Sequence, residues 1–112
     1  MQFKDNGDCI DIYDDGEISG TIFIDDCGVT FSTDCYFCEE ELKKIVKVME
    51  LARHRIPKDI ITFKDTENYI EITKNSKYNG SINKNDYVAY VGTNNTSHDL
   101  TVIINKIKEL KK

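Results

Sequence analysis

Several features are scarce or missing in this chain of 112 residues, which contains one proline, six glycines and no long apolar run. A membrane-spanning helix needs about 20 consecutive apolar residues, and collagen or linker sequences need far more glycine or proline. These three classes are therefore excluded. Apolar residues make up 39% of the chain and aromatic residues 10%, which is enough for a folded core. The length predicts a single domain over residues 1–112.

Targeting and catalytic motifs are missing as well. Residues 1–5 lead into polar sequence, so we expect no signal peptide, reduced cysteines and a cytoplasmic location. The abundance of lysine, asparagine and isoleucine is typical of a low-GC bacterium or its phage. There is no serine elbow, phosphate-binding loop or His-Glu-x-x-His motif, and His54 and His98 have no evident nucleophile to activate. We therefore expect neither enzymatic activity nor a cofactor.

The chain repeats itself at an offset of 60 residues. When residues 1–26 are laid over residues 61–86, eight positions are identical, whereas about one or two would match by chance. After Asp26 the offset becomes 59, and matches continue into the C-terminal part of each half. A fixed period of this kind predicts an internal duplication, with repeats of about residues 1–56 and 57–112. The identical positions are Phe3, Lys4, Asp5, Ile10, Ile12, Gly20, Ile22 and Asp26 with their counterparts.

Each repeat predicts four strands and one helix. The predicted ends of the second helix are residues 98 and 110, with Thr96 and Asp99, or Ser97, as its cap. The fold class is therefore α+β, a ββββα unit used twice, with an antiparallel sheet or sheets and two amphipathic helices. Whether the units share one sheet is left open. In the first repeat the elements are residues 2–5, 9–14, 17–25, 29–33 and the helix 39–54.

The isoleucine spacing predicts the pairing of the two central strands in each repeat. If Ile10 faces Ile22, then Ile12 faces Gly20, and residues 14–17 form a turn with a three-residue loop, since a slip of one residue would turn the isoleucines to opposite faces. The second repeat predicts the same pairing at its matching positions.

Positive charge is missing from a long part of the first repeat. From Asp5 to Glu41 there are twelve acidic residues and no lysine or arginine. Residues 1–60 have 7 basic and 14 acidic residues, a net charge of −7, and residues 61–112 have 8 and 6, a net charge of +2. A surface of one sign attracts a partner of the opposite sign and raises the association rate.

We therefore expect the first repeat to bind a basic protein surface, such as a nucleic-acid-binding groove whose phosphates the carboxylates imitate. Small acidic proteins of this kind include phage-encoded inhibitors of bacterial defence (anti-CRISPR proteins) and toxin-neutralising immunity proteins. The alternative is that acidic turns only keep the protein soluble. Direct contact with nucleic acid or membrane is not expected, and edge strands could support a homodimer. The candidate binding residues are Asp11, Asp14, Asp15, Glu17, Asp25, Asp26, Asp34, Glu39 and Glu40.

All four cysteines lie in the first repeat, and the second repeat has none. Cys35 and Cys38 have the spacing of a zinc knuckle or a redox motif, so a cysteine-dependent metal or thiol redox protein is the alternative function. The predicted sheet places Cys9 and Cys27 at one end and the other pair at the opposite end, roughly 17 Å away. One metal ion cannot bridge that distance, so we expect reduced structural thiols and no bound metal.

Overall fold

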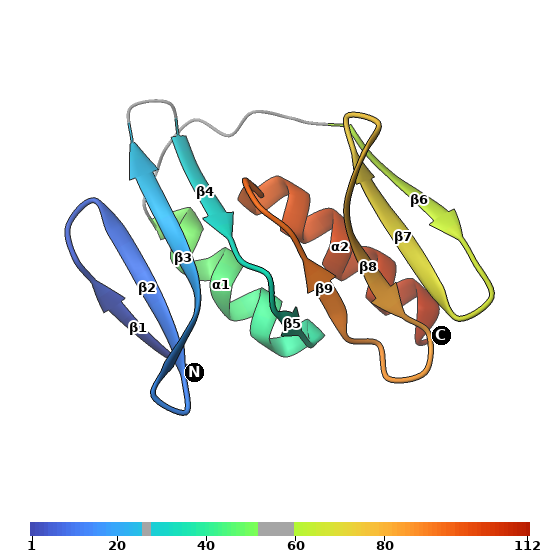
Figure 1. Cartoon of the computed structure of the whole chain (residues 1–112), viewed down its shortest axis with the longest axis horizontal. Coiled ribbons are helices and arrows are strands. Elements are labelled where there is room, and N and C mark those ends of the chain that lie inside the picture. The colour runs from blue at the N-terminus through green and yellow to red at the C-terminus, as the bar shows by residue number, and fades with distance from the viewer. Residues whose placement is uncertain (26–27, 52–59) are drawn as a thin grey trace.

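The computed structural model of the protein describes residues 1–25, 28–51 and 60–112 (Figure 1). Its first sheet contains four strands, in which the alternation of apolar and polar residues places isoleucine side chains on one face. The strands β1 to β4 lie side by side in chain order, and every pair is antiparallel. The predicted bounds agree with the observed ones to within one residue. The strands are Gln2–Asp5, Cys9–Asp14, Glu17–Asp25 and Gly28–Ser32.

The second sheet contains five strands in the order β5-β9-β8-β7-β6. Strand β5, Tyr36–Phe37, belongs to the first half of the chain and pairs with β9. A strand of two residues has no periodicity, and its partner lies far along the chain, so the sequence does not predict β5. The other strands, β6 to β9, are Ile61–Asp65, Tyr69–Lys74, Lys77–Asn83 and Ala89–Val91.

Two amphipathic helices complete the fold, α1 (Glu39–Leu51) and α2 (Ser97–Leu110). The part of the first predicted helix beyond Leu51 lies outside the described residues. The Thr96 hydroxyl accepts a hydrogen bond from the Asp99 N–H, and the Asp99 carboxylate accepts one from the Thr96 N–H, which confirms the predicted cap. The protein is therefore α+β, with two antiparallel sheets and two helices. Neither described helix has the length and apolar character needed to cross a membrane.

The predicted pairing of the central strands is confirmed in both sheets, but the predicted loop length is wrong. Ile12 pairs with Gly20, and Ile72 pairs with Gly80. A register shift follows Ile12, so that Asp14 pairs with Glu17 across a loop of two residues. A matching shift follows Ile72 in the second sheet. The bulge takes up the extra residue and permits a two-residue turn with left-handed backbone, which suits the twist of a hairpin.

The sheets form one layer, and both helices lie on the same side of it (Figure 1). Phe31 of β4 packs edge to face on Phe37 of β5 at 5.6 Å between ring centres, and it also pairs with Asn95 before α2. The buried apolar side chains of both halves form one cluster. Neither described helix covers the opposite side of the first sheet, which we name the open face. Its side chains include Lys4, Asp11, Tyr13, Ile18, Thr21 and Phe23.

Candidate interaction face and a charged pocket

The open face carries two exposed apolar side chains, Ile18 and Phe23, with exposed fractions of 58% and 45%. Phe23 pairs with Cys9 on β2 and Thr30 on β4, so its ring lies on a central strand. Ile18 pairs with Tyr13 near the β2–β3 turn. Apolar side chains of this size form the centres of many protein interfaces. The open face therefore has a suitable centre for binding another protein.

Asp11 is the one predicted binding residue in the middle of this face. It lies opposite Lys4 on β1 and Thr21 on β3. Its carboxylate accepts hydrogen bonds from the side-chain amide of Asn6 at 2.8 Å and from the Thr21 hydroxyl at 3.1 Å. These two donors fix the orientation of the carboxylate.

Several other predicted residues gather toward one end of the first sheet. The carboxylate of Asp14 lies 3.6 Å from the N-terminal ammonium group. Asp15 and Glu17 are exposed and form no ion pair with any described residue. The end of β4 and the start of α1 lie toward this same end, joined by residues 33–38 (Figure 1). We name Asp14, Asp15 and Glu17, in and beside the β2–β3 turn, the acidic end, whereas Asp34 follows β4 and Glu40 belongs to the first turn of α1.

Asp25, another predicted binding residue, ends β3 at the opposite end of the sheet. Strand β3 runs from Glu17 to Asp25 over nine residues, which corresponds to roughly 26 Å. Asp26 lies outside the described residues, as does the side chain of Asp25. The acidic end and the Asp25 end of β3 are therefore too far apart to contact one small patch on a partner.

Glu39 is held within the protein. Its buried carboxylate lies 2.8 Å from the Lys43 ammonium and 3.1 Å from the Lys111 ammonium at the end of α2. Hydrogen bonds from Lys43 and then Lys111 lower the pKa of Glu39 below its ordinary value of 4.5, although burial acts in the opposite direction. Because its charge is already paired, Glu39 joins the two helices and is unsuited to binding a partner.

We expect the Glu39→Gln variant to be less stable than the wild type at pH 7. The depressed pKa of Glu39 stabilises the fold above the unfolded value of about 4.5, and this contribution disappears as the pH falls through the folded pKa. The stability difference between the two proteins should therefore shrink on acidification. Urea unfolding at pH 7 and at about pH 3 measures it. Glu40→Gln, at a 74% exposed side chain, is the control with little effect, and a pH-independent difference for Glu39→Gln would contradict this role.

The described cysteines lie in two different places. Cys9 begins β2 of the first sheet, and Cys35 and Cys38 flank β5 of the second sheet, while Cys27 and His54 lie outside the described residues. Cys9, Cys35 and Cys38 form no disulfide. Within residues 1–25, 28–51 and 60–112, no three His, Cys, Asp or Glu side chains are placed to hold a metal ion. The Cys38 N–H donates to the Glu41 carboxylate at 2.9 Å, a contact that caps α1.

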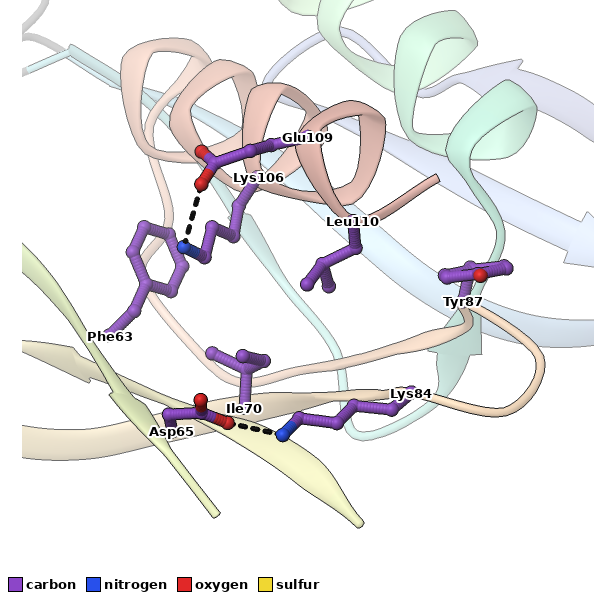
Figure 2. A pocket seen from close by; sticks show the side chains of 8 residues that line it. All are labelled: Phe63, Asp65, Ile70, Lys84, Tyr87, Lys106, Glu109 and Leu110. Atoms are coloured by element: carbon purple, nitrogen blue, oxygen red, sulfur yellow. Dashed lines mark hydrogen bonds and ion pairs between the residues drawn. The ribbon is translucent and has the colours of Figure 1, made fainter. Parts of the chain in front are cut away.

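The structure also contains a pocket that sequence reasoning did not find. It has a volume of about 480 Å³ and lies between the second sheet and the last turns of α2 (Figure 2). The Lys84 ammonium pairs with the Asp65 carboxylate, and the Lys106 ammonium lies 3.4 Å from the Glu109 carboxylate. One sequence signal pointed to it, because Lys84 occupies the position that matches Ile24 in the repeat. The lining residues are Phe63, Asp65, Ile70, Lys84, Tyr87, Lys106, Glu109 and Leu110.

Comparisons with known proteins give no further identification: no family model, curated protein or solved structure matches this chain.

Proposed function

We propose that this chain is a non-enzymatic binding protein that docks its open face and acidic end on a basic protein surface. The observation that carries the proposal is the pair of exposed apolar side chains, Ile18 and Phe23, on the same sheet as a group of exposed carboxylates. An apolar centre with a charged rim is the usual arrangement of a protein interface. The partner then needs a cationic surface with apolar contacts at its centre.

The partner that suits this surface best is a protein with a basic groove for nucleic acid. Carboxylates along β2 and in the turn next to it present negative charges on a rigid frame, as phosphates do on a nucleic acid backbone. Occupation of the groove would inhibit the partner, which is the action expected of an anti-defence inhibitor or an immunity protein. Electrostatic attraction also speeds the encounter and makes it sensitive to salt.

We further propose that the fold arose by duplication of one ββββα unit. The equal register, the bulge after Ile12 and after Ile72, and the left-handed turns that follow them support this origin. The turn residues Asp14 and Glu17 of the first unit correspond to Lys74 and Lys77 of the second. Because both turns have the same backbone form with opposite charge, folding does not require the acidic residues, and selection for binding can account for them.

Neutralising the acidic turn should weaken binding by about 10- to 100-fold at low salt. The test variant combines Asp14→Asn, Asp15→Asn and Glu17→Gln. Each lost ion pair is worth about 1 kcal/mol or less in water, and 1.4 kcal/mol corresponds to a tenfold change in affinity. The immobilised wild-type protein first captures its partner from a host lysate at low salt, and calorimetry then gives the dissociation constant of the purified partner for each variant.

A control with the same change in net charge distinguishes an effect of the acidic turn on affinity from an effect of the overall charge. It combines Glu67→Gln, Glu71→Gln and Asp86→Asn in the second repeat and should leave the affinity nearly unchanged. Phe23→Ser, in contrast, should weaken binding without changing its salt dependence. Capture of a partner that lacks a basic surface, or equal affinities for the two triple variants, would refute the proposed function.

A further inference from the structure

The pocket beside α2 has the size and composition of a small-molecule site. Its volume of about 480 Å³ falls within the usual range of roughly 300 to 1,000 Å³ for ligand pockets. Ile70 of β7 and Leu110 of α2 lie toward each other at its centre, while Phe63 and Tyr87 lie on either side (Figure 2). These four side chains offer an apolar and aromatic surface to a ligand.

Charges of both signs stand next to each other on two walls of this pocket. Lys84 and Asp65 pair on the sheet side, and Lys106 and Glu109 pair on the helix side (Figure 2). The lysine side chains are only 30% and 23% exposed, whereas both carboxylates are largely exposed. Lys106 also lies over the Phe63 ring, 5.5 Å from its centre. The ammonium groups are therefore held deeper than the carboxylates, and each wall presents a positive and a negative group side by side.

A comparison with the first repeat shows that the fold does not demand a lysine at position 84, whereas Asp65, Lys106 and Glu109 have identical counterparts in that repeat. The matching residues Phe3, Asp5, Ile10, Ile24 and Leu51 line a cavity of about 350 Å³ of their own. That cavity has an isoleucine where the second repeat has Lys84. The first repeat also has Gly28 where the second has Tyr87, whose φ of 59° is unfavourable for a tyrosine. The second repeat thus carries a cation and an aromatic ring that are not needed to build the unit.

We propose that this pocket binds a free α-amino acid with an apolar side chain. An α-amino acid carries its carboxylate and its ammonium on one carbon atom, which matches the adjacent charges on each wall. The ligand carboxylate lies at the Lys84 ammonium and the ligand ammonium at the exposed carboxylate of Asp65, so that both contacts come from the sheet wall, while Lys106 adds positive charge from the opposite wall. The apolar side chain packs on Ile70 and Leu110. This site is separate from the open face and does not depend on the proposed function.

Titration of the full chain with L-phenylalanine and L-leucine, followed by NMR, tests the assignment. We expect shifts centred on the pocket residues and a dissociation constant of about 1 mM or tighter, as suits ligands of this size. Two analogues separate the contributions of the charges, because 3-phenylpropionate lacks the ammonium and 2-phenylethylamine lacks the carboxylate. Each should bind at least about tenfold more weakly than L-phenylalanine. No shifts up to about 10 mM amino acid, or equal binding of an analogue, would overturn the proposal.

Two variants connect binding to the named lysines. Lys84→Ile installs the residue that the first repeat has at this position, and Lys106→Gln removes the other ammonium group. Lys84→Ile should reduce the affinity for L-phenylalanine by at least about tenfold, and Lys106→Gln should reduce it less, because Lys106 lies on the opposite wall. Lys64→Gln is the matched control, because Lys64 is exposed and pairs with Glu71 across the strands, away from the pocket. Unchanged affinity in both pocket variants, with native spectra, would disprove the lysine contacts.

Discussion

Gly80→Ala should lower the free energy of unfolding by about 3 to 5 kcal/mol, one of the largest effects of any small substitution in this protein. Gly80 lies in β8 between Ile72 and Val91 and has a φ of 148°, a conformation that residues with a side chain rarely adopt. An added Cβ would also overlap the carbonyl oxygen of Tyr90 on β9. Because the overlap is with backbone, the sheet itself must move. Strain and overpacking each contribute about 1 to 3 kcal/mol.

The matched control is Gly20→Ala at the corresponding position of the first sheet. There the added Cβ would lie 2.6 Å from the ring of Phe31, and no backbone atom is among the nearest contacts. The buried Phe31 ring must shift, but this disturbs the fold less than moving a paired strand backbone, so we expect a smaller loss of about 1 to 3 kcal/mol. Urea unfolding of the two variants gives the comparison. If Gly20→Ala proved equally or more destabilising, the backbone overlap would not be the dominant effect.

Asp99→Ala should destabilise the protein by about 3 to 5 kcal/mol. Asp99 is fully buried at the start of α2, and its carboxylate lies 2.9 Å from the Lys74 ammonium at the end of β7. It also accepts the Thr96 N–H at 3.0 Å. The variant loses the carboxylate that pairs with Lys74, whose side chain is 14% exposed, and it loses one of the two hydrogen bonds of the helix cap. The measurement is again the free energy of unfolding at neutral pH.

Two further variants show whether the ion pair or the cap dominates. Thr96→Ala removes the other half of the capping box, at the usual loss of about 1 kcal/mol. Lys74→Ala combined with Asp99→Ala should be less destabilising than the sum of the two single changes, because both single changes break the same ion pair. A loss for Asp99→Ala as small as that for Thr96→Ala would show that the buried pair contributes little.

Local patterns explain why much of the fold could be predicted. The alternation around Ile10 and Ile22 depends only on which face of a strand is buried, and the spacing of Leu42 and Ile45 only on the period of a helix. The cap of α2 is also a local pattern, since Thr96 and Asp99 are three residues apart. These signals gave correct element types and nearly correct ends.

The features that were not predicted depend on contacts between distant residues. The bulge after Ile12 shortens a hairpin loop, and only the three-dimensional twist of the strands favours that solution. The pairing of Glu39 with Lys111 joins residues from the two repeats. Composition indicated the acidic character of the first half. It could not show that Glu39 forms ion pairs with lysines of the same chain, or that Asp25 lies at the far end of β3. The pocket required the packing of α2 on the second sheet.

Strand β5 makes the second sheet dependent on both halves of the chain. It belongs to the first half by sequence, yet it completes the second sheet through Tyr36 and Tyr90. A fragment containing only residues 60–112 would leave the backbone hydrogen-bonding groups of β9 without this neighbour. Such a bare edge takes up the same segment from another molecule, which is the basis of domain swapping. The second sheet is therefore complete only when the N-terminal half of the chain supplies its edge strand.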